Sequence, residues 1–221
     1  MSPAGPRLLI ASFNPGKARE LARLLAPLGV AAVGLSDLSI REQYEETGHT
    51  YEENARGKAE HYAELAGLPA LADDSGLEVD ALGGRPGPLS ARFGGPELDD
   101  AGRCRLLLEE LAGVPEDRRG ARYVAVAAIA RPGSGADRKT RASGTAPATR
   151  LFRATCEGRI ASEARGSRGF GYDPIFFYPP FGATFGETPD AEKDRVSHRG
   201  QALAMVAGFL KTPEGRAFLS A

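Results

Sequence analysis

The stretch 72–92, which reads ADDSGLEVDALGGRPGPLSAR, constrains this chain more than any other. It begins with two adjacent carboxylates, Asp73 and Asp74, after a short apolar run that is typical of a buried strand reaching its end. Residues 75–76 (Ser-Gly) predict a turn, and the glycines and prolines of 83–88 predict a second, rigid turn. Neighbouring carboxylates repel unless a positive group lies beside them, and a divalent cation is the usual one. The pair alone fits a solvated turn equally well, but the surrounding glycines and prolines favour a loop shaped around a ligand.

Composition limits the class of protein. At 221 residues, with 42% hydrophobic and 26% charged residues, the chain is an ordinary globular protein with room for a sizeable core. A formal net charge of -1 argues against a general nucleic-acid binder. Cys104 and Cys156 show no CxxC spacing, so we expect reduced thiols in a cytoplasmic protein rather than a disulfide framework or a zinc site. No apolar stretch approaches the roughly 18 residues of a membrane span, and residues 1–6 are predicted to be a loose tail.

The first quarter of the chain predicts a strand at 8–12, a helix at 17–25 and a second strand at 30–35. Asn14-Pro15-Gly16 marks the turn between the first strand and the helix. Backbone amides at such a helix start, with Lys17 in the first turn, would cradle a phosphate. The Walker A pattern is absent, and an ordinary turn with a solvated lysine is the alternative.

An acidic loop precedes the next predicted helix. Thr50 and Glu53 form a capping box, so a helix should run from about residue 51 to 65. Asn54 and Lys58 stand four apart and therefore share one helix face. Glu46 lies just before this helix and could turn back towards the same site, although alone it would be an ordinary surface charge.

The middle of the chain predicts an amphipathic helix at 99–111 and a strand at 123–130. Residues 132–149 lack apolar periodicity and predict an exposed hairpin loop. A returning strand at 151–160 would be antiparallel to 123–130, which makes the sheet mixed.

A second glycine-rich loop, 166–174, carries Phe170 and Tyr172. Aromatic rings between glycines could stack on a nucleobase or could simply pack in the core. Strand 175–178 follows, and Thr188-Pro189 predicts a helix start.

The final helix is predicted to be capped by Ser197 and to run through Leu210. His198 and Arg199 lie at its beginning, where the helix dipole disfavours basic side chains. They indicate an anionic or carbonyl-bearing partner, although such a pair is more often a surface feature.

Together these features resemble the inosine triphosphate pyrophosphatase family, the Ham1-like purine nucleoside triphosphate pyrophosphatases. ADDSGLEVDALGGRPGPLSAR resembles the family signature, and four further blocks follow the family order: SFNPGK at 12–17, EETG at 45–48 with ENA at 53–55 and KA at 58–59, GFGYDPIF at 169–176, and SHRGQA at 197–202. The blocks cover nearly the whole chain. Ordered blocks of this kind are far more specific than a lone glycine loop.

The resemblance implies an α/β fold: a mixed, elongated, twisted sheet flanked by helices in two lobes, with the active site in the cleft between them. It implies a single two-lobed domain over 7–212, a C-terminal end at 213–221, and a homodimer. The implied reaction is hydrolysis of ITP, dITP and XTP to the nucleoside monophosphate and pyrophosphate, which removes deaminated purines from the nucleotide pool. Purine nucleoside triphosphate is the expected partner; nucleic acid and membrane are not. The alternatives are a Maf-like pyrophosphatase of other base specificity and a nucleotide-binding module without turnover.

The resemblance also assigns roles to residues. Glu46 and Asp74 would bind Mg2+, the implied cofactor, and Asp74 would be the general base; Asp73 could instead be the base, with Asp74 purely a ligand. Arg199 or protonated His198 could bond the 6-oxygen of the base and would be left unpaired opposite the amine of adenine. The implied substrate-binding residues are Ser12, Phe13, Asn14, Pro15, Gly16, Lys17, Lys58, Ser75, Phe170, Gly171, Tyr172, Asp173, Lys193, His198 and Arg199.

Overall fold

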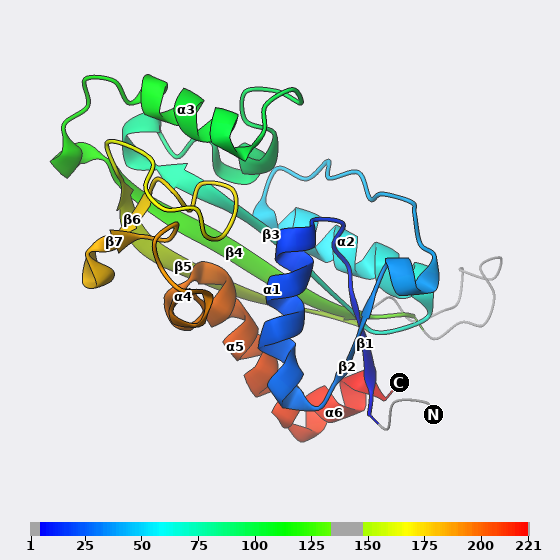
Figure 1. Ribbon diagram of the computed structural model, residues 1–221. Coiled ribbons are helices and arrows are strands. Elements are labelled where there is room, and N and C mark those ends of the chain that lie inside the picture. Colours follow the sequence, from blue (N-terminus) through cyan, green and yellow to red (C-terminus); the bar gives the residue numbers. More distant parts are fainter. Residues whose placement is uncertain (1–4, 134–147, 221) are drawn as a thin grey trace. The chain divides into compact units, whose positions relative to one another are not determined.

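A seven-stranded sheet organises the computed structural model, which describes residues 5–133 and 148–220 (Figure 1). Hydrogen-bonded neighbours follow the order β2-β1-β3-β4-β5-β6-β7. The strands are β1 (Arg7–Ile10), β2 (Ala31–Gly34), β3 (Ala70–Val79), β4 (Gly120–Arg131), β5 (Ala148–Ile160), β6 (Phe176–Tyr178) and β7 (Ala183–Thr184). β1 pairs in parallel with β2 and β3, whereas β6 pairs antiparallel with β5 and β7. The predicted mixed α/β sheet is confirmed.

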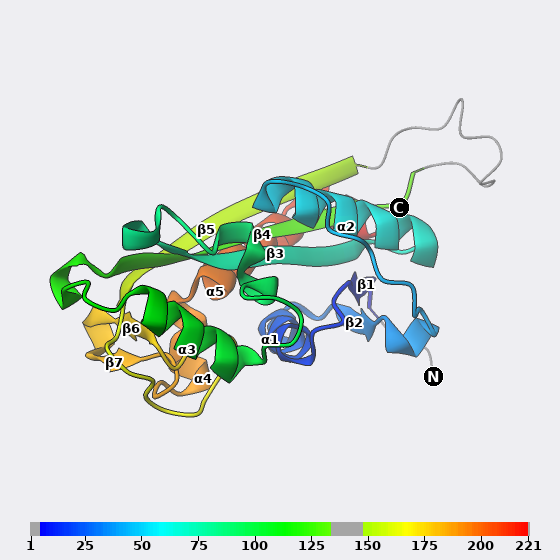
Figure 2. The same ribbon diagram turned by 90° about the horizontal axis from the view of Figure 1, so that it is seen from above.

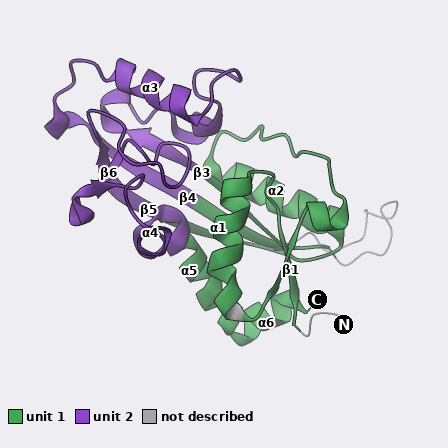
Figure 3. Cartoon of the chain, in the orientation of Figure 1, with its two compact units in different colours: residues 1–74, 126–153, 202–221 green, residues 75–125, 154–201 purple. Residues whose placement is uncertain are grey.

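The chain divides into two compact units, coloured separately in Figure 3. Unit 1 comprises residues 1–74, 126–153 and 202–221, and unit 2 comprises 75–125 and 154–201. Strands β3, β4 and β5 contribute residues to both units. The boundary in β3 falls directly after Asp74, so the acidic pair belongs to unit 1.

Unit 1 contains two parallel crossovers, built on helices α1 (Pro15–Leu25) and α2 (Tyr51–Ala66). Both helices contact β1. Because β2 and β3 lie on either side of β1, right-handed crossovers place α1 and α2 on opposite faces of this part of the sheet (Figure 2). Both helices therefore begin at the carboxyl ends of parallel strands, where binding groups gather in α/β sheets.

Side-chain caps explain where these helices begin. The Asn14 side chain accepts hydrogen bonds from the amides of Gly16 and Lys17. The predicted capping box of α2 is present: Thr50 Oγ1 accepts from the Glu53 amide at 3.1 Å, and the Glu53 carboxylate accepts from the Thr50 amide at 3.1 Å. Those two bonds satisfy amide groups that have no partner within the helix.

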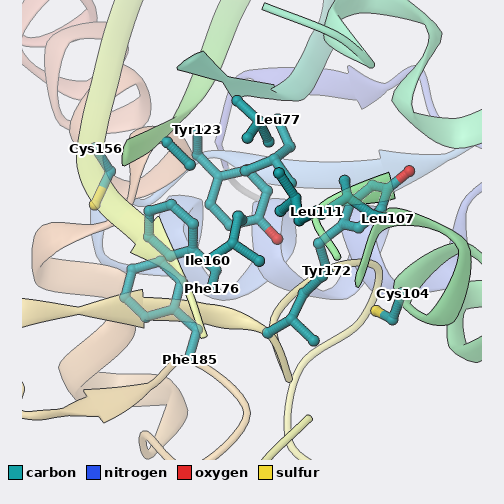
Figure 4. Close-up of a cluster of buried hydrophobic side chains, with 13 residues drawn as sticks. Leu77, Cys104, Leu107, Leu111, Tyr123, Cys156, Ile160, Tyr172, Phe176 and Phe185 are labelled. Carbon is teal, nitrogen blue, oxygen red and sulfur yellow. The ribbon is translucent and has the colours of Figure 1, made fainter. Parts of the chain in front are cut away.

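Unit 2 is built around the aromatic cluster shown in Figure 4. The rings of Tyr123, Phe176 and Phe185 lie with centroids 4.5–6.2 Å apart, a separation at which aromatic pairs attract each other. Helix α3 (Asp100–Glu110), capped by Asp99, contributes Leu107 to the same cluster. These buried apolar side chains support the second glycine-rich loop.

Three helices complete the described chain: α4 (Asp190–Val196), α5 (His198–Lys211) and α6 (Pro213–Leu219). Ser197 caps α5 as predicted, because its hydroxyl accepts from the Gly200 amide at 3.1 Å. Residues 213–221 were expected only to end the chain, and helix α6 was not predicted. Its signal is the Thr212-Pro213 start, where the Thr212 hydroxyl accepts from the Gly215 amide.

The predicted turn at Ser75-Gly76 is wrong, because β3 continues through both residues to Val79. Gly76 serves a close approach instead: a Cβ at this position would collide with the carbonyl oxygen of Gly87 and lie 2.7 Å from Ser90 Oγ. Ser90 Oγ accepts from the Leu77 amide at 2.8 Å and donates to Gly87 O at 2.6 Å. Gly76 therefore lets the short helical segment Gly87–Arg92 dock on the strand.

Two predictions fall wholly or partly on residues that the structure does not describe. Residues 1–4 of the predicted tail and 134–147 of the predicted hairpin loop lie outside the described residues. None of the helices in 5–133 and 148–220 combines the length and the apolar character that crossing a bilayer requires.

Replacing Gly76 with alanine tests the close approach. Because the colliding atom is a backbone carbonyl, Gly76→Ala should lower the free energy of unfolding by about 1–3 kcal/mol. Gly208→Ala in α5 is the matched control: a Cβ added there would meet no atom within 4 Å, so it should raise stability by about 0.5–1 kcal/mol. Urea denaturation measures both, and equal effects of the two substitutions would contradict this account of Gly76.

Candidate active site

The loop after β1 brings Ser12, Asn14 and Lys17 together at the start of α1. Ser12 Oγ accepts from the Asn14 amide at 3.3 Å, and Asn14 Oδ1 accepts from Gly16 N at 2.9 Å and Lys17 N at 3.1 Å. The expected anion cradle is thus occupied in part by the protein's own cap. Lys17 points its charge at Asp73, with Nζ 3.3 Å from Oδ2.

The acidic pair lies inside the sheet, with Asp73 2% and Asp74 4% exposed. Asn54 Nδ2 donates to Asp74 Oδ2 at 3.1 Å, and Lys58 Nζ donates to the Asp73 carbonyl at 3.1 Å. Lys58 also forms an ion pair with Glu46. The predicted convergence of Glu46 and Lys58 on the acidic pair is therefore observed within unit 1.

Charge and burial act in opposite directions on these groups. Desolvation raises the pKa of Asp74, Lys17 and Lys58 lower it, and the charge of Glu46 raises it again; the net shift is upward. Burial disfavours the charged form of Lys58, but Glu46, Asp73 and Asp74 together outweigh it and raise the pKa of the ammonium. Three carboxylates and two lysines are thus grouped in this part of unit 1, and each lysine is paired with a carboxylate.

The donor set suits a divalent cation that keeps other ligands. Among the described residues, no three His, Cys, Asp or Glu side chains form a group that could hold a metal unaided. Mg2+ commonly takes only one or two carboxylates, with water and substrate phosphate oxygens completing its shell. Glu46 and Asp74 supply two carboxylates whose charges interact with each other, and they fit that requirement.

Unit 2 holds the other predicted residues, and two of them, Phe170 and Lys193, bond the carboxylate of Asp173. Its Oδ2 accepts from Lys193 Nζ at 2.6 Å and from the Phe170 amide at 2.9 Å, and its Oδ1 accepts from Tyr123 Oη at 3.3 Å. Gly169 has φ +71°, and a Cβ there would collide with Asp173 Oδ2. The glycine therefore lets the loop close over the carboxylate.

Helix α3 and the helical segment Gly87–Arg92 also hold this loop by hydrogen bonds. Asp100 Oδ2 accepts from the Gly171 amide at 2.7 Å, and Cys104 Sγ lies 3.4 Å from the Gly171 carbonyl oxygen, to which it donates. Tyr172 Oη donates to Ser90 O at 2.9 Å. Tyr172 is 4% exposed, so its ring packs in the core.

Phe170 is the aromatic ring of this loop that faces cations. Lys193 Nζ and Arg199 Cζ lie 5.3 Å and 5.4 Å from its centroid. Arg199 Nη2 also donates to Ser75 Oγ at 2.9 Å. His198 stacks on Tyr123 with centroids 4.5 Å apart and planes 10° apart. Arg199 thus brings Ser75 and Phe170 together in unit 2, and His198 precedes it on the same helix.

Sequence reasoning missed the part played by Tyr123, which it treated only as the first residue of a strand. Its hydroxyl bonds Asp173 and its ring supports His198. Burial, followed by the charge of Asp173, raises the pKa of Tyr123 well above the usual value, so the hydroxyl remains a donor. The available signal was a tyrosine at the head of a strand that otherwise carries small aliphatic side chains.

Lysines beside paired carboxylates in unit 1, and a glycine-held aromatic ring beside basic donors in unit 2, define a nucleotide-binding α/β protein with groups suited to metal-assisted phosphate chemistry. The Ham1 family matches residues 8–209, and the chain belongs to that family.

Named relatives cover almost the whole chain. A dITP/XTP pyrophosphatase of Yersinia pseudotuberculosis is 44% identical over 93% of this chain and 98% of its own length. One of Methylococcus capsulatus is 46% identical over 95% and 98%. Among solved structures, a HAM1 protein from Coxiella burnetii aligns with a TM-score of 0.78 at 38% identity, covering 93% of this chain and 98% of its own.

The pKa of Asp74 makes a prediction about stability. A carboxyl whose folded-state pKa is raised contributes stability that is complete below its unfolded pKa, near 3.8, and is lost as the pH rises through the folded value. Asp74→Asn removes the charge, so the metal-free variant should melt above wild type at pH 7, with the two Tm values converging towards pH 3.8.

Thermal denaturation in a chelating buffer measures this difference. Asp80→Asn serves as control, because Asp80 is exposed and pairs with Arg122; it should change stability by no more than about 1 kcal/mol. If Asp74→Asn instead melts below wild type at pH 7, the attraction of Lys17 and Lys58 for the Asp74 carboxylate outweighs the cost of burying its charge.

Proposed function

We propose that this chain hydrolyses ITP, dITP and XTP to the nucleoside monophosphate and pyrophosphate with Mg2+ as cofactor, and so clears deaminated purines from the nucleotide pool. The relatives named dITP/XTP pyrophosphatase support the substrate class. The observation that carries the mechanism is the set of three carboxylates and two lysines around Asp73 and Asp74, in the middle of β3.

Lys17 and Lys58 take the triphosphate in this proposal. Each lysine is held beside a carboxylate, Asp73 for Lys17 and Glu46 for Lys58. The phosphate oxygens of an incoming triphosphate carry more charge than a carboxylate and compete with Asp73 and Glu46 for the two ammonium groups. Once the lysines bind phosphate, the carboxylates are free to interact with a cation. A bound divalent cation would neutralise the charge that develops on the phosphate oxygens, with Glu46 and Asp74 as its protein ligands.

Asp74 is the proposed general base. It accepts a proton from a water that attacks the α-phosphorus; the bond from that phosphorus to the bridging oxygen breaks, and pyrophosphate leaves. A pKa above the usual aspartate value strengthens the carboxylate as a proton acceptor. Asp73, which holds Lys17 and offers its carbonyl to Lys58, is assigned to positioning both lysines.

The set in unit 2 takes the base. Phe170 offers a ring for stacking, and Arg199, with His198 beside it, offers donors to a 6-oxo group. An amine at that position would leave the donors unpaired, which costs more than a weak contact gains. Lys193, buried against Asp173, is assigned to the Phe170 loop rather than to the phosphates. Ser12–Gly16, Ser75 and Gly171–Asp173 complete the proposed substrate contacts.

The proposal also includes a single two-lobed domain over 7–212, a homodimer and a cytoplasmic location. Cys104 and Cys156 are free and buried, as suits a reducing compartment. Burial raises the pKa of both thiols to about 12, so neither is a reactive thiolate at neutral pH.

A nucleotide panel tests the proposed reaction. Pyrophosphate release from ITP, dITP and XTP should exceed that from ATP by at least about 100-fold, because an unpaired buried donor opposes adenine. The assay includes GTP and dTTP and is repeated with a chelator, which should abolish release. Preferred turnover of a standard nucleotide would discard the base assignment, and nucleotide binding without release would favour the binding module.

Substitution of each acidic residue tests the division of labour. Asp74→Asn should lower kcat by about 100-fold to 10,000-fold, as loss of a general base does, while dITP binding persists. Asp73→Asn should act mainly on KM through Lys17. The exposed control Asp80→Asn should keep the wild-type rate. A larger loss of kcat in Asp73→Asn than in Asp74→Asn would exchange the two roles.

A further inference from the structure

Three side chains of α2 form one stripe: Asn54, Lys58 and Tyr62. Each is four residues from the next, so all three lie on the same helix face. The stripe faces residues 42–48, a segment without helix or strand that precedes α2 and passes above the helix in Figure 1. Both segments belong to unit 1.

The stripe holds the segment at alternate residues. Asn54 Oδ1 accepts from the Gly48 amide at 2.9 Å, and Lys58 pairs with the carboxylate of Glu46. The Tyr62 hydroxyl accepts from Tyr44 N at 2.9 Å and donates to Glu42 O at 2.9 Å. Positions 42, 44, 46 and 48 thus face the helix, as expected of an extended chain with its period of two. Glu46 lies midway between the two backbone attachments.

The Tyr62 attachment is buried and built to fit. Tyr62 is 2% exposed, and its ring packs edge-to-face with the Phe13 ring, with centroids 6.3 Å apart. Burial raises the pKa of the Tyr62 hydroxyl, which keeps it protonated and able to donate. Gly57, one turn before, leaves the space for the Tyr44 ring, because a Cβ there would collide with the Tyr44 hydroxyl.

We propose that Tyr62 is a positioning residue for the metal-binding carboxylate Glu46, acting through its two hydrogen bonds to the backbone of residues 42 and 44. The proposal rests on the function proposed above, in which Glu46 and Asp74 share a cation. Asn54 connects the Gly48 end of the segment to Asp74, because its side-chain amide accepts from Gly48 N and donates to Asp74 Oδ2. Tyr62 completes the attachment, so that Glu46 is held at a set distance from Asp74 before metal binds.

Removing the hydroxyl tests this role. Tyr62→Phe keeps the ring and loses both hydrogen bonds, so Glu46 remains tethered on the Asn54 side only. Residues that orient metal ligands typically change metal affinity by about 10–100-fold, and we expect about tenfold weaker Mn2+ binding for Tyr62→Phe. Mn2+ binding is measured by electron paramagnetic resonance without nucleotide, with Glu46→Gln as the variant that lacks the ligand.

A matched control separates positioning from stability. Thr188→Val in unit 2 also loses a buried hydroxyl, which donates to the Thr184 carbonyl at 2.8 Å. It should bind Mn2+ like wild type. Hydrogen exchange at the Tyr44 amide should accelerate in Tyr62→Phe alone. Gly57→Ala, which displaces Tyr44 from the other side, should weaken Mn2+ binding in the same direction.

The outcomes distinguish this inference from the proposed function. Wild-type protein that binds Mn2+ and releases pyrophosphate from dITP, with Tyr62→Phe equal to it in Mn2+ affinity, overturns the positioning role alone. Equal weakening in Tyr62→Phe and Thr188→Val also overturns it, because the loss is then one of general stability. Wild-type protein that neither binds Mn2+ nor releases pyrophosphate overturns the proposed function and the inference with it.

Discussion

The repulsion between the buried carboxylates Asp73 and Asp74, in the middle of β3, is the constraint on which unit 1 depends. Charges taken out of water cost several kcal/mol each unless partners compensate them. Lys17, Lys58 and Asn54 come from two different helices to meet this pair. The starts of α1 and α2, with their caps, fix where those side chains arrive. The pKa of Asp74 is nevertheless raised, so the desolvation of this carboxylate outweighs the attraction of its neighbours.

Unit 2 shows the contrasting case of a buried carboxylate with full compensation. Asp173 receives a lysine, a tyrosine hydroxyl and a backbone amide. Such a network favours one loop conformation, because each donor would be left unsatisfied in another. Asp173 therefore fixes the conformation of the loop that carries Phe170. Asp74, in contrast, has a raised pKa, which suits a group that accepts a proton.

A site of this kind trades stability for activity. The groups that oppose folding in unit 1 are those that the proposed reaction uses, and stability is recovered elsewhere, in the fully buried side chains of β4 and in the aromatic cluster of unit 2. The stripe on α2 adds a second contribution: it orders an irregular segment before any ligand arrives, so less ordering remains to be done on binding.

The sequence by itself determined the features whose cause is local. Thr50 and Glu53 predict the start of α2, and Asn14 and Pro15 predict that of α1. The spacing of Asn54 and Lys58 places both on one helix face. Caps and helical periodicity depend only on residues within a few positions, so the sequence shows them directly. The ordered blocks at both ends of the chain indicated the family, and the family match confirms it.

Tertiary structure decided what depends on residues far apart in sequence. Ser75-Gly76 reads locally as a turn, yet strand pairing and the docking of Ser90 keep it extended. No local pattern indicates that Lys193 pairs with Asp173, or that the Tyr62 hydroxyl bonds the segment that carries Glu46. In each case the deciding partner lies 13 to 20 residues away, beyond the reach of any local rule.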